Sequence, residues 1–286
     1  MSRSERIAAA FKRACLAELD ALKPGNVHAF AAGHRMTIEQ FVRSAEAAAA
    51  PLAQPGARVG QRILGAVDAT HAVVGTNTNL GIILLCAPLA AAAERDEPEF
   101  RSALAAVLAD LDTADAGLAF RAIVRASPAG LGHVERNDVA QPAQVTLREA
   151  MADAADRDRI ARQYVTAYAD IFDVGLPGLA AAAARGFAPE WAVTSNYLEF
   201  LAEFPDSHLV RKYGTGVAAD VQACATTFRA ALQSSRDPSH LTGELLAWDA
   251  ALKARDINPG TSADLTVATL FAHGLATILP SERNSD

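Results

Sequence analysis

The chain has 286 residues and a formal net charge of -7, and it is 51% hydrophobic but only 6% aromatic. It is long enough for one large domain or two small ones, and its acidic balance excludes a general basic surface for nucleic acid. Many alanines, few aromatic residues and little β-branched alternation favour close-packed helices, so we expect an all-α fold.

The cysteines and the apolar segments indicate the cellular compartment of the protein. Cys15, Cys86 and Cys224 lie far apart in apolar segments, without a CxxC pair or a cysteine–histidine cluster, so disulfides and structural zinc are not expected. The first apolar run, residues 7–11, is too short for a signal peptide. The uncharged run 73–93 begins with polar residues, and the remainder has the length of a buried core helix. We therefore expect a cytoplasmic protein without a membrane span.

The first predicted helix covers residues 4–22 and ends at the turn Lys23-Pro24-Gly25. Its apolar stripe, with steps of three and four residues, includes Glu18. Lys23 at the helix end either complements the helix dipole or contacts a phosphate, and the residues alone favour the dipole. The loop that follows carries His34, and Thr37 is expected to cap the next helix.

Residues 59–94 contain two apolar helices joined by the polar turn 75–81, which reads GTNTNLG. The first helix is amphipathic, whereas residues 82–93 carry no charge on any side. A helix that is apolar all round belongs in the interior of a protein. We expect residues 82–93 to be the central helix of one compact domain, residues 1–280, with 281–286 as a frayed tail.

The turn before this central helix is a candidate binding site. A buried helix N-terminus presents unpaired N–H groups and a partial positive charge, which suit phosphate. Thr78 and Asn79 are good capping residues, and the amides of Asn77 and Asn79 can turn toward one ligand. Simple capping by these residues explains their presence equally well.

A capping box formed by Thr146 and Glu149 predicts a helix that continues to about residue 172. The apolar stripe of this helix contains Asp158. Because a carboxylate facing a core is costly unless it is paired or metal-bound, Asp158 is a candidate functional group. The alternative is an ion pair with Arg162, four residues further along the same helix.

The last third of the chain supplies further polar candidates. Asp206 or the next residue caps a short helix that ends with Arg211 and Lys212, a basic pair suited to a phosphate chain or simply to the helix C-terminus. Residues 261–264 cap the last predicted helix, 265–279, and Asp264 in its first turn is explained by the helix dipole alone.

Five segments, in the same order along the chain, resemble the motifs of one family. They are Lys23-Pro24-Gly25-Asn26-Val27, Gly33-His34-Arg35-Met36, GTNTNLG at 75–81, Asp206 with Arg211 and Gly214, and PGTSADL at 259–265. The turn is similar to the G-x-N-T-H-K-G signature of the triphosphoribosyl-dephospho-CoA synthase family, which makes the prosthetic-group precursor of citrate lyase and malonate decarboxylase. The matches span nearly the whole chain.

The resemblance implies a transferase in which a ribose hydroxyl of 3'-dephospho-CoA attacks the anomeric carbon of ATP's ribose, expels adenine and keeps the triphosphate. Such a site needs cations for the triphosphate, a base for the hydroxyl and a hydrogen bond for adenine. We expect His34 to contact adenine, and Asp158 or Asp206 to act as the base or to hold Mg²⁺. The residues expected to bind the substrates are Lys23, Asn77, Thr78, Asn79, Arg211, Lys212 and Asp264.

Two departures from the family pattern indicate a divergent branch. Asn79 and Leu80 stand where the signature has histidine and lysine, and the segment at His34 lacks the aspartate of the family's G-A-H-x-D-M. The alternatives are a ribosyl-triphosphate transferase or hydrolase with another acceptor, for example in pterin-type cofactor biosynthesis, or a non-catalytic helical nucleotide-binding protein. The expected partners are ATP and dephospho-CoA or a related small acceptor, and a homo-oligomer is left open.

Overall fold

The computed structural model describes residues 1–29, 37–97, 99–128 and 136–278. The regular elements in these residues are helices, which confirms the predicted all-α fold. The α-helices are α1 Arg3–Asp20, α2 Ile38–Leu52, α3 Val59–Val74, α4 Leu80–Ala92, α5 Phe100–Ala109, α6 Thr113–Ala126, α7 Leu147–Ala154, α8 Arg159–Thr166, α9 Leu176–Ala184, α10 Pro189–Glu203, α11 Ser207–Tyr213, α12 Thr215–Ser234, α13 Thr242–Ala254 and α14 Gly260–Ala276. A π-helical turn, Asp170–Gly175, and a 3-10 turn, Pro238–Leu241, complete the set.

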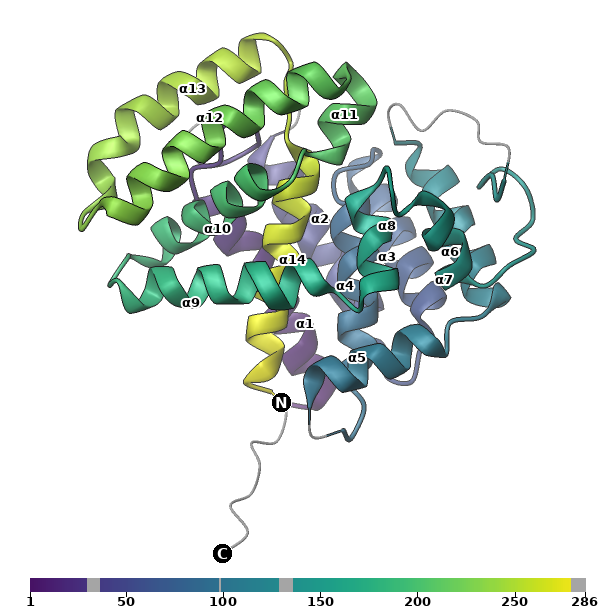
Figure 1. The fold of residues 1–286 in the computed structure, drawn as a ribbon. Helices are drawn as coiled ribbons and strands as arrows, with labels where there is room; N and C mark the ends of the chain where they lie inside the picture. The colour runs from purple at the N-terminus through teal and green to yellow at the C-terminus, as the bar shows by residue number, and fades with distance from the viewer. Residues whose placement is uncertain (30–36, 98, 129–135, 279–286) are drawn as a thin grey trace, which may run out of the picture.

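Helix α14 runs between two groups of helices (Figure 1). The blue and teal helices α2–α8 lie on one side of it, and the green helices α9–α13 lie on the other. Helix α14 packs against α1, α4 and α10, and Leu270 within it contacts the apolar clusters of both groups. In the described residues, no helix is long and apolar enough to cross a membrane.

Helix α4 is the predicted central helix, and it begins two residues earlier than expected. All of its residues are buried except Gly81 and Ala91, which are partly buried. Pro88 inside the helix has no N–H, so the carbonyl of Leu84 loses its usual helical donor. The Tyr164 hydroxyl donates to that carbonyl at 2.7 Å, and the Tyr168 hydroxyl donates to the next one at 2.8 Å. Tyr164 therefore satisfies a buried carbonyl that the helix leaves without its usual donor.

The continuous helix predicted from residue 147 to about 172 is wrong, because the chain breaks there twice. Helix α7 ends at Ala154, and Asp158 starts a new helix by accepting hydrogen bonds from the backbone N–H groups of Ile160 and Ala161. Aspartate competes with the helix in this way because its short side chain bonds to nearby backbone donors. Ala167 and Tyr168, both with positive φ, then end α8.

The start of the last helix also differs from the prediction. Helix α14 begins at Gly260, five residues before the predicted start, so Asp264 is its fifth residue and lies beyond the first turn. The helix dipole acts mainly on the first turn, so it does not explain an acidic residue at this position.

Candidate active site

A cavity of about 460 Å³ lies where the N-terminal ends of α4, α8 and α14 meet. Its polar wall is formed mainly by Glu18, Asn26, Asn77, Thr78, Asn79, Asp158, His208, Arg211, Asn258, Thr261 and Asp264. Its larger apolar side chains are Phe41, Leu84, Phe120, Ile123, Leu147 and Met151. The structure thus brings together six of the predicted site residues: Asn77, Thr78, Asn79, Asp158, Arg211 and Asp264.

The three polar residues before α4 do different things. Asn77 Oδ1 accepts the backbone N–H of Leu80 at 3.0 Å, so Asn77 supplies the side-chain cap that was expected from its neighbours. The Thr78 hydroxyl donates to Ser44 Oγ at 2.6 Å. Asn79 occupies the N-cap position but makes no side-chain cap bond, is 5% exposed, and has an Nδ2 group without a hydrogen-bond partner among the described residues. Its Nδ2 group is therefore an unpaired buried donor beside the cavity.

Asp264 lies directly against the first turn of α4. A Cβ atom built on Gly81 would lie 2.0 Å from Asp264 Oδ2 and 2.8 Å from Ile160 Cδ1, so a side chain at position 81 would displace this carboxylate. Within the described residues, Asp264 has no hydrogen bond or ion pair.

The electrostatic surroundings of Asp264 disfavour its charged form. Burial raises the pKa of this carboxyl well above its usual value, and the nearby carboxylates of Asp206, Glu18 and Asp158 raise it further. The Arg211 guanidinium lowers the pKa only in part. A carboxylate whose pKa lies nearer neutrality accepts a proton more readily than an ordinary aspartate does.

Asp158 and Arg211, distant in sequence, form an ion pair on the cavity wall. Arg211 Nη1 lies 3.2 Å from Asp158 Oδ2, and the two side chains are 27% and 28% exposed. The alternative pairing of Asp158 with Arg162 is therefore wrong. The idea that Asp158 faces a core is also wrong, since it caps the start of α8 at the cavity edge.

Asp206 caps α11, as the sequence predicted, but it does not line the cavity. Its Oδ1 accepts the backbone N–H of Leu209 at 3.1 Å, and its Oδ2 accepts the N–H and the hydroxyl of Ser262 at 2.8 and 2.9 Å. Both oxygens are thus used to join α11 to α14. This placement gives no support to the predicted roles of Asp206 as a base or as a magnesium ligand.

Lys23 is fully buried and does not line the cavity. Its Nζ donates to Glu18 Oε1 at 2.5 Å, to the Val27 carbonyl at 2.6 Å and to Asn26 Oδ1 at 3.3 Å. An ammonium has three donors, and these three acceptors use all of them. The predicted contact between Lys23 and a phosphate is therefore replaced by a contact with Glu18.

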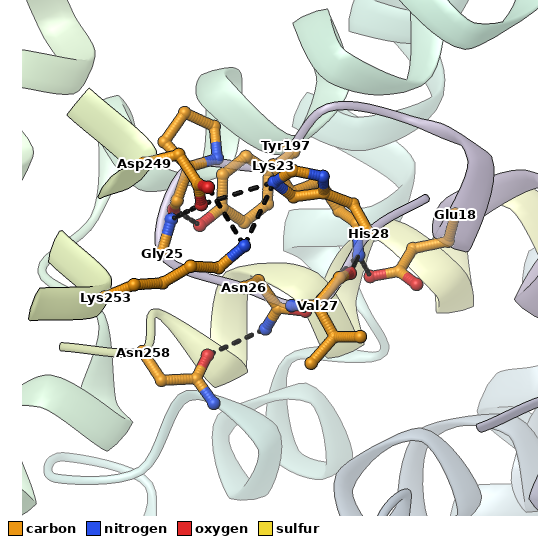
Figure 2. Close-up of polar contacts among 11 residues, drawn as sticks. Glu18, Lys23, Gly25, Asn26, Val27, His28, Tyr197, Asp249, Lys253 and Asn258 are labelled. Carbon is orange, nitrogen blue, oxygen red and sulfur yellow. Dashed lines mark hydrogen bonds and ion pairs between the residues drawn. The ribbon is translucent and has the colours of Figure 1, made fainter. Parts of the chain in front are cut away.

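The rest of the Lys23 segment, residues 23–28, is held by two other helices. The Gly25 N–H donates to Asp249 Oδ1 at 2.8 Å, and the Tyr197 hydroxyl donates to the Pro24 carbonyl at 2.8 Å. Asn26 Nδ2 donates to Asn258 Oδ1 at 2.8 Å, next to the start of α14 (Figure 2). This segment fixes α1, α13 and the start of α14 relative to one another.

The two remaining predicted residues are Lys212 and His34. Lys212 points to the surface, where its Nζ lies 2.8 Å from Asp256 Oδ2. His34 lies outside the described residues.

Several residues of the cavity wall were not predicted as site residues, among them Glu18 and His208. Glu18 was detectable, because a carboxylate in the apolar stripe of the first helix carries the same signal that was used for Asp158. His208 is adjacent to Arg211, with 3.3 Å between its Nδ1 and Arg211 Nη2. No sequence pattern distinguishes His208 from an ordinary surface histidine.

Comparisons with known proteins agree with these features. The profile of the CitG family, described as ATP:dephospho-CoA triphosphoribosyl transferase, matches residues 4–282. Among solved structures, a candidate triphosphoribosyl-dephospho-CoA synthase from Archaeoglobus fulgidus has a TM-score of 0.64 and 23% identity, covering 80% of this chain and 95% of that chain. At this identity the likeness shows a shared fold. No curated protein matches the chain.

Proposed function

Because the chain belongs to the CitG family of ATP:dephospho-CoA triphosphoribosyl transferases, we propose that the transfer takes place in the cavity at the starts of α4, α8 and α14. One observation carries this proposal: the turn before α4, the Asp158–Arg211 pair and Asp264 come from distant segments and face the same cavity. The reaction replaces the bond from ATP's anomeric carbon to adenine with a bond to a ribose oxygen of dephospho-CoA.

The triphosphate of ATP is assigned to the polar wall. Helices α4 and α14 are 13 and 17 residues long, and both begin at the cavity, so their N–H groups and dipoles favour a bound anion there. Arg211 adds a guanidinium, and Asn79 Nδ2 adds an unpaired donor. The donor of Asn79 is neutral, in contrast to the histidine of the family signature, so its contribution does not depend on pH.

We propose that ATP binds with Mg²⁺, because acidic side chains outnumber basic ones on the described part of the cavity wall. Among the described lining residues, the acidic ones are Glu18, Asp138, Asp153, Asp158 and Asp264, and the basic ones are Arg136, Arg157 and Arg211. No cluster of three or more suitable ligands occurs in the described residues, which fits a cation shared with phosphate oxygens. In the part of the chain that the structure describes, Asp158 Oδ2 pairs with Arg211, and Asp158 is the residue that we assign to this cation. Mg²⁺ would neutralise part of the triphosphate charge.

The apolar wall is assigned to a purine ring. Phe41, Phe120 and Met151 offer aromatic and thioether surface, on which a flat base loses little solvation and gains dispersion contacts. The cavity volume lies within the range of about 300–1,000 Å³ that is typical of small-molecule sites. We further propose that residues 1–280 act as one catalytic domain, because α14 packs against both groups of helices. The proposed location of the enzyme is the cytoplasm.

Adenine release tests the proposal. The protein is incubated with ATP, Mg²⁺ and dephospho-CoA, and free adenine is quantified by chromatography for the wild type, Arg211→Ala and Arg229→Ala. Arg229 is a matched control, because it also forms ion pairs, is 24% exposed and lies outside the cavity wall. Adenine release that needs dephospho-CoA and falls only in Arg211→Ala supports the proposal. Equal rates in all three proteins would place the reaction elsewhere.

A further inference from the structure

We propose that Asp264 is the general base that removes the proton from the attacking ribose hydroxyl. This inference rests on the proposed function, because it requires the transfer to occur in the cavity that Asp264 lines. It goes beyond the sequence, which assigned Asp264 to substrate binding and explained it by the helix dipole.

The other carboxylates on the cavity wall are already engaged. Glu18 pairs with Lys23, Asp158 with Arg211 and two backbone N–H groups, Asp153 with Asn137 Nδ2, and Asp138 Oδ1 accepts the backbone N–H of Ala140. Among the described lining residues, Asp264 differs from these four because both of its oxygens are without a hydrogen-bond partner. A general base needs an oxygen free to accept a proton from its substrate.

The position of Asp264 suits the chemistry as well. Its Oδ2 lies over Gly81, in the first turn of the helix whose start is assigned to the triphosphate. Glycine at position 81 lets this carboxylate approach the α4 backbone, and any larger residue would push it away. With the triphosphate at the start of α4, as proposed above, this carboxylate would lie near the ribose that carries it, where the acceptor hydroxyl must arrive.

The step balances with Asp264 in this role. The acceptor hydroxyl gives its proton to an Asp264 oxygen, and its own oxygen forms a bond to the anomeric carbon of ATP's ribose. The bond from that carbon to adenine breaks, its electron pair leaves with adenine, and adenine takes up a proton from water. Asp264 then returns its proton to solvent.

The protonation of Asp264 is controlled from several sides. The titratable and charged groups that act on it or lie near it are Cys15 and Glu18 on α1, Lys23, Cys86 on α4, Asp158 at the start of α8, Asp206 before α11, and His208 and Arg211 on α11. Burial and the neighbouring carboxylates raise its pKa. Because only the ionised carboxylate is a base, the transfer rate should fall as the pH is lowered through this raised pKa.

The test compares Asp264→Asn with Asp220→Asn, a matched change at an exposed aspartate on α12. Single-turnover adenine release should fall about 10²- to 10⁴-fold in Asp264→Asn, which is the usual contribution of a general base. Calorimetry should show that the same variant binds ATP with Mg²⁺ as tightly as the wild type. The acidic limb of the pH–rate profile should be absent from its residual activity.

A second variant keeps the carboxylate but displaces it. Gly81→Ala should also lower adenine release, because its Cβ would collide with Asp264 Oδ2. If Asp264→Asn loses ATP binding and excess Mg²⁺ restores it, Asp264 is a metal ligand and the inference is wrong. If Asp264→Asn keeps the rate of Asp220→Asn while Arg211→Ala is slow, the inference fails and the proposed function stands. If all these variants keep the wild-type rate, the proposed function itself fails.

Discussion

Two polar regions border the same cavity, and they differ in whether their groups are paired. In the Lys23 segment, the ammonium of Lys23 is surrounded by three acceptors and the Gly25 N–H is bonded to Asp249 (Figure 2). At the junction of α4 and α14, which we call the Asn79–Asp264 corner, Asn79 Nδ2 is buried without a partner in the described part of the chain. The Asp264 carboxylate there forms no hydrogen bond or ion pair with another described residue.

This difference separates residues that build the site from residues that touch the substrate. A buried polar group costs free energy unless it is paired, so a paired network stabilises the fold, whereas an unpaired group is tolerated where a ligand completes it. The Lys23 segment therefore acts as scaffold and the Asn79–Asp264 corner as binding surface. Substitutions in the first region should reduce stability, and those in the second should reduce activity.

The largest effect is expected for Lys23→Met. This change leaves the Glu18 carboxylate buried without its partner, which costs about 3–5 kcal/mol of the free energy of unfolding. Urea denaturation measures the loss. The double variant Glu18→Gln with Lys23→Met should lose less, because no unpaired charge remains. If the Lys23→Met protein is stable but no longer binds ATP, the result would support the contact between Lys23 and a phosphate that the sequence predicted.

Asn79→Ala tests the opposite region. Removing an amide that has no described partner within the protein should leave stability nearly unchanged, whereas the lost hydrogen bond to a charged phosphate should cost about 1.5–3 kcal/mol of binding, or roughly tenfold to a hundredfold in KM for ATP. Steady-state kinetics and a thermal melt measure the two quantities. A large drop in stability with an unchanged KM would make Asn79 part of the scaffold.

Asp264→Asn should stabilise the protein at neutral and higher pH. The pKa of Asp264 is raised in the folded state, so its contribution to stability is fully present below the unfolded pKa and is lost as the pH rises through the folded pKa. Asparagine stays neutral, so the variant should gain stability above that pH, and the gain should vanish in acid. Thermal melts across pH measure it. If the variant is less stable than the wild type at every pH, the claim that the Asp264 carboxylate is unpaired is wrong.

The smallest effect is expected for Lys212→Met, the cation that the sequence placed beside the triphosphate. Its pair with Asp256 lies at the surface, where such pairs contribute about 0–1 kcal/mol. Calorimetry should show ATP binding comparable to that of Arg229→Ala. A clear loss of ATP affinity would show that Lys212 contacts ATP, as the sequence predicted.

The fold was more predictable than the roles of its residues. A segment without charge on any side can only be buried, so the central helix was evident from residues 82–93 alone. Periodicity failed at Asp158, because an aspartate that caps a new helix falls in the same register as one inside a continuous helix. The same signal is present at Glu18, where it was not used, and there it would have indicated a buried carboxylate correctly, since no break interrupts α1.

The pairing of polar groups could not be predicted at all. Lys23 and Asp264 both belong to motifs of the family. Lys23 is buried in an ion pair with Glu18, whereas Asp264 lines the cavity. That distinction depends on contacts between segments that lie far apart in the chain, such as Gly81 with Asp264.

A crystal structure of the Asp264→Asn variant with ATP and Mg²⁺ tests the central claim most directly. The triphosphate should lie at the starts of α4 and α14, within hydrogen-bond distance of Asn79 and Arg211, with the anomeric carbon of the ribose facing residue 264. ATP bound outside this cavity, or with its phosphates against Lys23 or Lys212, would contradict the account.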